Sequence, residues 1–132
     1  MYPRKSIQTG TIWETNVGYS RAVRVGSLIE VAGTTAMDGQ DIQCQGDVYG
    51  QTKFVIQKMA KALKDLGSDL HHVVRTRVYL KHMSDWEEAG RAHGEFFSEI
   101  KPASTMLAVN ALIHPELLVE VEMTAMIPDA DI

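Results

Sequence analysis

The most regular pattern of apolar positions in the chain lies between residues 47 and 66. Apolar residues recur there at intervals of three and four, as on one face of an amphipathic helix: Val48, Val55, Met59, Ala62, Leu63 and Leu66. Asp47 is suited to cap the start of this helix, and Gly67 is suited to end it. The pattern predicts a helix over residues 47–66 with one face against a core.

Two short runs rich in β-branched residues precede this helix, at residues 21–25 and 28–33. Only Gly26-Ser27 separates them, which predicts a tight β-hairpin. Residues 1–20 and 34–46 contain glycines and many polar residues, and we expect them to be irregular.

Residues 73–82, after the helix, alternate as in a strand. The predicted core face carries Val74, Thr76, Val78 and Leu80. The opposite face carries Arg75, Arg77, Tyr79 and Lys81.

A second helix is predicted from Ser84 to about Ser98. Ser84 and Glu87 have the spacing of a capping box, with Ser84 as N-cap. The predicted inner stripe of this helix is Trp86, Ala89, His93 and Phe97. Residues 105–111 and 117–127 are expected to form the last two strands.

The element order β-β-α-β-α-β-β predicts an α+β fold of two layers, ferredoxin-like in general plan. Right-handed crossovers place both helices on the same face of the sheet. The opposite face is left uncovered, and the alternation puts Glu120 and Glu122 there together with Arg75, Arg77 and Tyr79. Such a mixture of charges and apolar groups indicates an interface between subunits.

The length of 132 residues predicts a single domain, residues 1–132, with one core. The net charge of −4 argues against nonspecific attraction to nucleic acid. The lone Cys44 is interpreted as a loop thiol, and the five histidines show neither triad nor metal spacing. No apolar run is long enough to span a membrane, and the N-terminus lacks the apolar region of a signal peptide, so we expect a cytoplasmic protein.

Residues 101–109, KPASTMLAV, are a candidate place for chemistry, because a proline ends a helix there and two hydroxyl residues lead into a strand. Ser104 and Thr105 have two interpretations: they bind a ligand carboxylate, or they cap backbone groups at the strand entrance.

Several motifs resemble the YjgF/RidA/UK114 family, also called the L-PSP endoribonuclease-like family. In chain order they are GYSRAVRVG at 18–26, AGT at 32–34, VYLKHMSDW at 78–86, EFF at 95–97, KPA at 101–103 and LVEVE at 118–122.

The resemblance implies a chorismate-mutase-like homotrimer, in which three sheets form a central barrel and ligand clefts lie between subunits. The deaminase branch of this family hydrolyses reactive enamine and imine intermediates to a 2-oxo acid and ammonia. It uses no metal and no cofactor. A small carboxylate-containing metabolite is therefore the expected ligand, in addition to the chain's own copies as partners.

Carried over by position, Glu120 matches the family's glutamate, Tyr19 its cleft tyrosine and Gly33 the glycine that lets backbone approach the ligand. Ser104 stands where the family has its carboxylate-binding arginine. Three further departures are Ala32 for a serine, Gly90 for an asparagine and Met106 for a cysteine. We therefore expect a weak or altered deaminase activity, with Arg21 and Arg77 as candidate replacements for the arginine.

Several alternatives stay open. Glu120 is either a water-positioning base or a salt-bridge partner of Arg75 or Arg77 across an interface. Tyr19 is either a cleft residue or a packed aromatic. The protein is a hydrolase, a non-catalytic ligand-binding protein on the same fold or, as the family's older name implies, an endoribonuclease.

Overall fold

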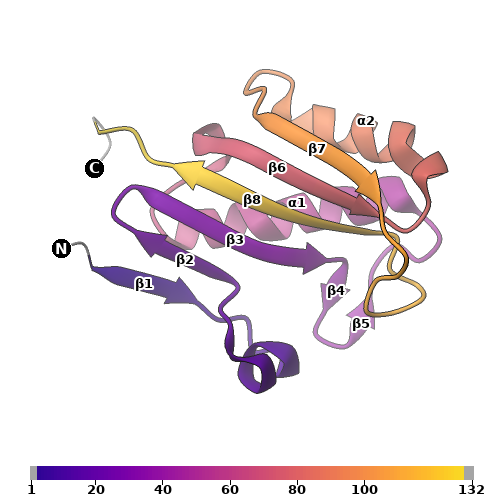
Figure 1. Ribbon diagram of the computed structural model, residues 1–132, viewed down its shortest axis with the longest axis horizontal. Helices are drawn as coiled ribbons and strands as arrows, with labels where there is room; N and C mark the ends of the chain where they lie inside the picture. Colours follow the sequence, from indigo (N-terminus) through magenta and orange to yellow (C-terminus); the bar gives the residue numbers. More distant parts are fainter. Residues whose placement is uncertain (1–2, 130–132) are drawn as a thin grey trace.

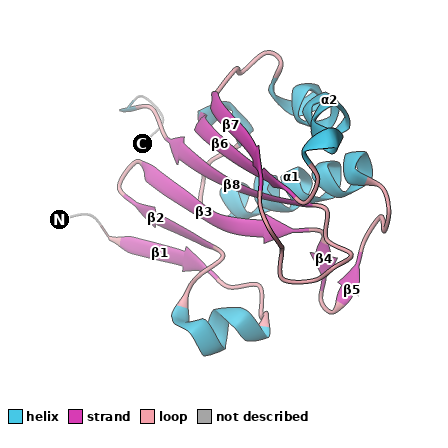
Figure 2. Cartoon of the chain, turned by 45° about the vertical axis from the view of Figure 1, so that its right-hand side comes forward, coloured by secondary structure: helices cyan, strands magenta, loops and turns pink. Residues whose placement is uncertain are grey.

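A six-stranded sheet with two α-helices on one face makes up most of the computed structural model, which describes residues 3–129 (Figures 1 and 2). The strands are β1 (Arg4–Ile7), β2 (Ala22–Val25), β3 (Leu28–Thr35), β6 (Val73–Leu80), β7 (Ala103–Ala108) and β8 (Val119–Met126). The helices are α1 (Val48–Asp65) and α2 (Trp86–Phe97). The strand order is β1-β2-β3-β8-β6-β7, so β1 and β7 are the two edges.

Both helices cover the same sheet face, and the predicted α+β class is confirmed. β6 and β7 are parallel, because the chain crosses over through α2 between them, and the other pairs are antiparallel. The fully buried side chains fill the layer between sheet and helices, and they include Val55, Ile56 and Leu63 of α1 and Val119 and Val121 of β8.

Helix α1 agrees with its sequence pattern, since all six residues of the predicted stripe are buried. Asp47 is its N-cap and accepts a hydrogen bond from the backbone N–H of Gly50 at 3.0 Å. Gly67 follows the helix at φ +85°, a conformation that glycine adopts without strain. The hairpin of β2 and β3 is also confirmed, with Gly26 at φ +60° in its turn.

The expectation that residues 1–20 and 34–46 are irregular is wrong in part. The first segment contains β1, which pairs with β2, and a five-residue π-helix at Glu14–Gly18. The second contains the end of β3 and a small hairpin of β4 (Met37–Asp38) and β5 (Asp41–Ile42). Isolated segments this short carry too little hydrophobic periodicity to be recognised, and pairing with neighbouring chain stabilises them.

Val74 does not face the core as predicted. The β6–β8 register shifts between Val73 and Arg75, so that Val73 is buried and Val74 is 46% exposed. A bulge of this kind reverses the alternation locally. From Thr76 onward the predicted faces of β6 hold, although β6 ends at Leu80.

The start of α2 also differs from the prediction. A short 3₁₀ helix, Met83–Asp85, leads directly into α2, and neither N-cap position makes a side-chain capping bond. The capping box of Ser84 and Glu87 is therefore not formed. Trp86 is 53% exposed instead of belonging to the inner stripe, whereas Ala89 and Phe97 are buried.

The last two strands are shorter than their predicted ranges 105–111 and 117–127: β7 begins two residues earlier and ends at Ala108, and β8 covers Val119–Met126. The alternation in β8 is confirmed, since Val119, Val121 and Met123 are buried on the helix side.

Candidate functional site

A pocket of about 210 Å³ lies beside β3 where its pairing with β2 stops. The β2–β3 register ends at Ala22 and Val31, so the last residues of β3 have a free edge on that side. Residues from five separate segments line the pocket. They include Tyr19, Arg21, Gly33, Thr35, Lys58 and Glu120.

Gly33 and Glu120 make the closest approach in this pocket. β3 has an irregularity between Val31 and Thr34 in its register with β8, typical of a β-bulge beside a functional site. A Cβ atom at Gly33 would lie 2.1 Å from Oε2 of Glu120. Because no real Cβ contact is that short, the carboxyl group can occupy this position only opposite a glycine.

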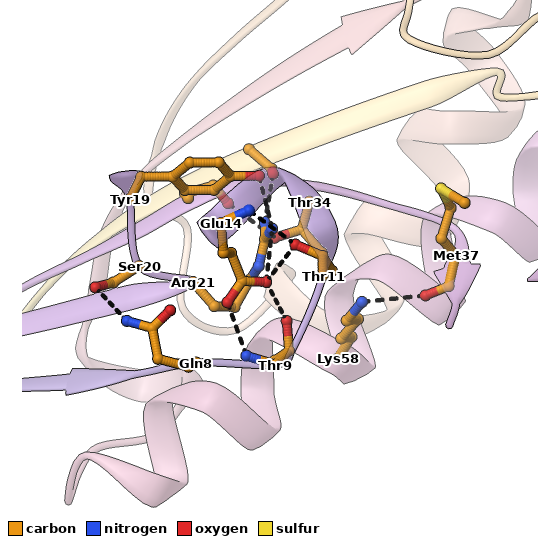
Figure 3. Close-up of polar contacts among 12 residues, drawn as sticks. Gln8, Thr9, Thr11, Glu14, Tyr19, Ser20, Arg21, Thr34, Met37 and Lys58 are labelled. Carbon is orange, nitrogen blue, oxygen red and sulfur yellow. Dashed lines mark hydrogen bonds and ion pairs between the residues drawn. The ribbon is translucent and has the colours of Figure 1, made fainter. Parts of the chain in front are cut away.

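Arg21 closes the free edge of β3 (Figure 3). Its Nη1 donates to the carbonyl of Gly33 at 2.6 Å and to Oγ1 of Thr34 at 3.2 Å. Its Nη2 donates to the hydroxyl of Tyr19 at 3.3 Å and lies 3.5 Å from Oε2 of Glu14. The guanidinium thus takes the place of a neighbouring strand and fixes the backbone of Gly33. Its Nε is buried without a hydrogen-bond partner among the described residues.

Glu14 is the counter-ion of Arg21 and is itself buried. Its carboxylate accepts hydrogen bonds from the backbone N–H of Thr9 at 2.8 Å, the hydroxyl of Thr9 at 2.6 Å and the hydroxyl of Thr11 at 2.7 Å (Figure 3). Burial by itself raises the pKa of Glu14, but these hydrogen bonds and the charge of Arg21 outweigh it and lower the pKa to about 2. The carboxylate is therefore ionised at neutral pH and holds the π-helix segment against the pocket.

Glu120 has the opposite balance. Burial raises its pKa and Glu122 adds to the shift, while the charge of Arg21 opposes it. A carboxyl group with a raised pKa holds a proton more readily than a free one, which suits a group that must accept a proton and return it. Lys58, on α1, adds a half-buried ammonium group to the same pocket.

The structure brings three of the five sequence-predicted site residues together in one chain: Tyr19, Gly33 and Glu120. Ser104 and Thr105 are not among the residues that line this pocket, because they lie on the edge strand β7. The Oγ of Ser104 is 2.8 Å from Oγ1 of Thr76, which lies 2.9 Å from Nε2 of His93. Burial lowers the pKa of that histidine.

Thr105 points to the other side of β7 and accepts a hydrogen bond from Nη2 of Arg75 at 2.6 Å. Arg77 lies 3.6 Å from Glu122, to which the hydroxyl of Tyr79 also donates at 2.9 Å. Within the chain, Arg75 and Arg77 are therefore engaged on the uncovered face and do not line the pocket around Glu120. Of the two arginines considered as replacements, only Arg21 does so.

Sequence reasoning missed Glu14 and Lys58. A signal for Glu14 was present, since Thr11 and Glu14 have the Thr-x-x-Glu spacing of a capping box, and the backbone N–H of Glu14 does donate to the Thr11 hydroxyl at 3.2 Å. Lys58 gave no signal, because a lysine on the border of a helix stripe resembles any solvated lysine.

Residues 3–129 hold neither a cluster of metal-binding side chains nor a helix able to span a membrane. Over this range, no three His, Cys, Asp or Glu side chains are placed to hold a metal ion together. None of its helices combines the length and apolarity that crossing a membrane requires.

Comparisons with known proteins place the chain in a family. Residues 11–127 match the family model described as Endoribonuclease L-PSP. The chain is 40% identical over 121 residues to an uncharacterized protein of Streptomyces coelicolor, covering 92% of this chain and 90% of that protein. It is 26% identical over 108 residues to the 3-aminoacrylate deaminase RutC of Acinetobacter baylyi, covering 81% and 85%.

Among solved structures, a Mycobacterium tuberculosis member of the YjgF/YER057c/UK114 family superposes with a TM-score of 0.85 at 42% identity. The match covers 95% of this chain and all of that one, 100%. The residues matched by the family model include the pocket residues from Thr11 to Glu120. The chain belongs to the L-PSP endoribonuclease family, also known as the YjgF/RidA/UK114 family.

Proposed function

We propose that this protein hydrolyses small, reactive enamines or imines that carry a carboxylate, releasing a 2-oxo acid and ammonia without a metal or cofactor. The observation that carries this proposal is the convergence of Tyr19, Gly33 and Glu120 on one pocket. The name of the Acinetobacter baylyi relative, a 3-aminoacrylate deaminase, supports the same reaction class.

The proposed chemistry requires one water molecule and one group that moves a proton. The water oxygen bonds to the imine carbon as Glu120 takes a proton from the water. Glu120 then returns this proton to the nitrogen, which gives a carbinolamine. In a second transfer it moves the proton of the new hydroxyl group to the amine nitrogen as the carbon–oxygen double bond forms and the carbon–nitrogen bond breaks, so that ammonia leaves and a 2-oxo acid remains. The raised pKa of Glu120 suits both halves of this cycle.

Residues next to Glu120 position the substrate in this proposal. Tyr19 presents a hydroxyl group, and the side chain of Arg21 holds both this hydroxyl and the carbonyl of Gly33 in place. Since Gly33 has no side chain, substrate and carboxyl group can both approach its backbone.

We propose further that the active species is a homotrimer with clefts between subunits, in which Ser104 and Thr105 of a neighbouring copy face the pocket. The exposure of β7 on the sheet edge supports this arrangement. Three exposed apolar residues support it too, because their cross-strand pairing places them on the sheet face without helices: Leu28, Leu107 and Met126. A serine at position 104 supplies hydroxyl hydrogen bonds in place of an arginine's charged pair, so we expect turnover slower than that of an arginine-containing relative.

The direct test is ammonia release from freshly generated 2-aminoacrylate. We expect Glu120→Gln to lower kcat/KM by about 100-fold or more, with Glu88→Gln, at an exposed position of α2 away from the pocket, as the matched control. Ser104→Arg should raise kcat/KM by adding a charged partner for the substrate carboxylate. A wild-type rate equal to the uncatalysed rate, in a protein shown to be trimeric, would disprove the hydrolase.

A second candidate function is ligand binding without turnover, which the serine at position 104 favours. It predicts that the wild type binds 2-oxo acids but releases no ammonia, and that Glu120→Ala leaves binding unchanged. The net charge of −4 argues against an endoribonuclease. RNA cleavage that persists in Glu120→Ala and Tyr19→Phe would indicate a contaminating nuclease.

A further inference from the structure

A second, larger cavity adjoins the pocket of Glu120. It has a volume of about 700 Å³, against about 210 Å³ for the inner pocket. The two share four lining residues: Thr11, Trp13, Met37 and Lys58. The two cavities are therefore neighbours, with these four residues at the junction.

The walls of the outer cavity come from Lys58 of α1 and from two segments that sequence reasoning left irregular. One covers residues 9–16 and contributes Ile12, Trp13 and Asn16, and the other is the hairpin of β4 and β5, which contributes Asp38 and Gln40. The cavity thus combines a large apolar side chain with several polar groups, as small-molecule sites commonly do.

Lys58 is the only cationic side chain that lines both cavities among the described residues. Its ammonium group donates one hydrogen bond, to the backbone carbonyl of Met37 at 3.1 Å (Figure 3). In the described part of the chain it forms no ion pair, whereas Arg21 beside it is paired with Glu14. An ammonium has three N–H donors, so two remain for a ligand.

The electrostatic surroundings of Lys58 favour the binding of an anion. Burial, and then the charge of Arg21, lowers the pKa of Lys58, while Glu14 and Asp38 act in the opposite direction. A bound carboxylate would relieve the repulsion between the two cations and replace the hydration that the ammonium has lost.

We propose that Lys58 binds the carboxylate of the substrate at the junction of the two cavities. This inference rests on the proposed function, because it assigns the substrate of the same site. The reactive carbon then lies in the inner pocket with Glu120, and the substrate's side chain extends into the outer cavity. The preferred ligands are accordingly 2-imino and 2-oxo acids with a bulky, uncharged side chain, since Asp38 opposes a second anionic group there.

The test measures binding of product-type acids by isothermal titration calorimetry, which does not depend on turnover. The probes are phenylpyruvate, pyruvate and the uncharged methyl ester of phenylpyruvate. We expect the wild type to bind phenylpyruvate at least 10-fold more tightly than pyruvate or the ester. Lys58→Met should remove at least 10-fold of the affinity for phenylpyruvate without changing that for the ester.

Two variants complete the experiment. Lys58→Arg keeps the positive charge and should recover most of the affinity, which separates loss of the charge from loss of the fold. Lys61→Met is the matched control, because Lys61 is on the same helix, exposed and paired with Asp65. It should bind all three probes as the wild type does.

The outcomes separate this inference from the function on which it rests. If phenylpyruvate binds in a Lys58-dependent manner and no ammonia is released from any imine, the proposed hydrolase activity is wrong and the assignment of Lys58 as the carboxylate-binding residue stands. If imines are hydrolysed, and Lys58→Met binds phenylpyruvate and hydrolyses imines as the wild type does, the role of Lys58 is wrong and the proposed hydrolase activity stands. Equal affinity for pyruvate and phenylpyruvate, or no binding of either acid, would overturn the inference.

Discussion

At the scale of single residues, the pocket depends on a close contact between a carboxyl group and a backbone. The Oε2 atom of Glu120 occupies the space in which a side chain at position 33 would begin. Arg21 holds the carbonyl of Gly33 from the open edge of β3, and Glu14 holds Arg21 in turn. Each of these residues fixes the position of the next. Some substitutions here should therefore change turnover, and others the free energy of unfolding.

The first prediction concerns Gly33→Ala. Its Cβ must displace the flexible end of Glu120, which costs little folding free energy but moves the carboxyl group out of the pocket. We expect ammonia release to fall about 10-fold or more, with a small change in the melting temperature. The control is Gly90→Ala in α2, where a Cβ meets no atom within 4 Å and turnover should not change. Unchanged turnover in Gly33→Ala would show that the position of Glu120 does not matter.

The second prediction concerns Glu14→Gln. Removing the carboxylate leaves the buried guanidinium of Arg21 without its counter-ion, at a cost of about 3 kcal/mol in the free energy of unfolding at pH 7. The pKa of Glu14 is lowered from 4.5 to about 2, so its contribution is complete above about pH 4.5 and is lost as the pH falls toward 2. The difference between wild type and variant should shrink over that range in urea unfolding experiments.

Glu88→Gln is the control for this prediction, because its ion pair with Arg91 is exposed and should contribute much less. A stability difference for Glu14→Gln that does not vary between pH 5 and pH 2 would contradict the assignment.

At the scale of elements, α1 connects the pocket to the rest of the fold. Its first turn is fixed by Asp47 and by Gln51, whose buried amide donates to the carbonyl of Glu116 at 3.0 Å and accepts from the N–H of Leu118 at 2.8 Å. These bonds attach the segment before β8 to α1. Further along the same helix, Lys58 reaches the pocket.

The third prediction compares the starts of the two helices. Asp47→Ala removes a capping hydrogen bond and should lower the free energy of unfolding by about 1 kcal/mol. Ser84→Ala should change it by less than about 0.5 kcal/mol, because Ser84 makes no capping bond. Chemical denaturation measures both. An equal loss of unfolding free energy in the two variants would contradict this, and would support the capping box that the spacing of Ser84 and Glu87 predicts.

At the scale of the whole molecule, one sheet face and the edge strand β7 remain uncovered by the chain's own helices. The uncovered face combines exposed apolar residues, such as Leu28 and Leu107, with the partly buried group of Arg77, Tyr79 and Glu122. Such composition is typical of an interface between subunits. The pocket around Glu120 lies beside β3, whereas Ser104 lies on the edge strand β7, so the two do not meet within one chain.

The fourth prediction is the oligomeric state. Sedimentation equilibrium at micromolar concentration should give three chain masses, and Leu107→Asp should shift the distribution toward one. Met83→Asp places the same charge at an exposed position in the 3₁₀ helix before α2 and should leave the trimer intact. A monomeric wild type would rule out a cleft between subunits.

The amino-acid sequence by itself determined the helix α1, the hairpin of β2 and β3, and the two faces of β8. These elements carry periodic apolar patterns or turn residues whose consequences are local, and they suffice to predict helices on one face of a sheet. The motifs also indicated Tyr19, Gly33 and Glu120. Sequence reasoning was wrong at Val74 and Trp86, where a bulge and a 3₁₀ turn changed which way a side chain faces.

Only the tertiary structure decided how the pocket is built. Its residues come from five segments that are far apart in the chain: residues 11–21, residues 33–37, Lys58 of α1, Ile113 and Glu120 of β8. They meet beside the end of β3, where its pairing with β2 stops. The roles of Glu14, Arg21 and Lys58 depend on burial and on the distances between their charges. Those quantities are properties of packing, because the pKa and the pairing of a charged group are set by neighbours that local sequence does not specify.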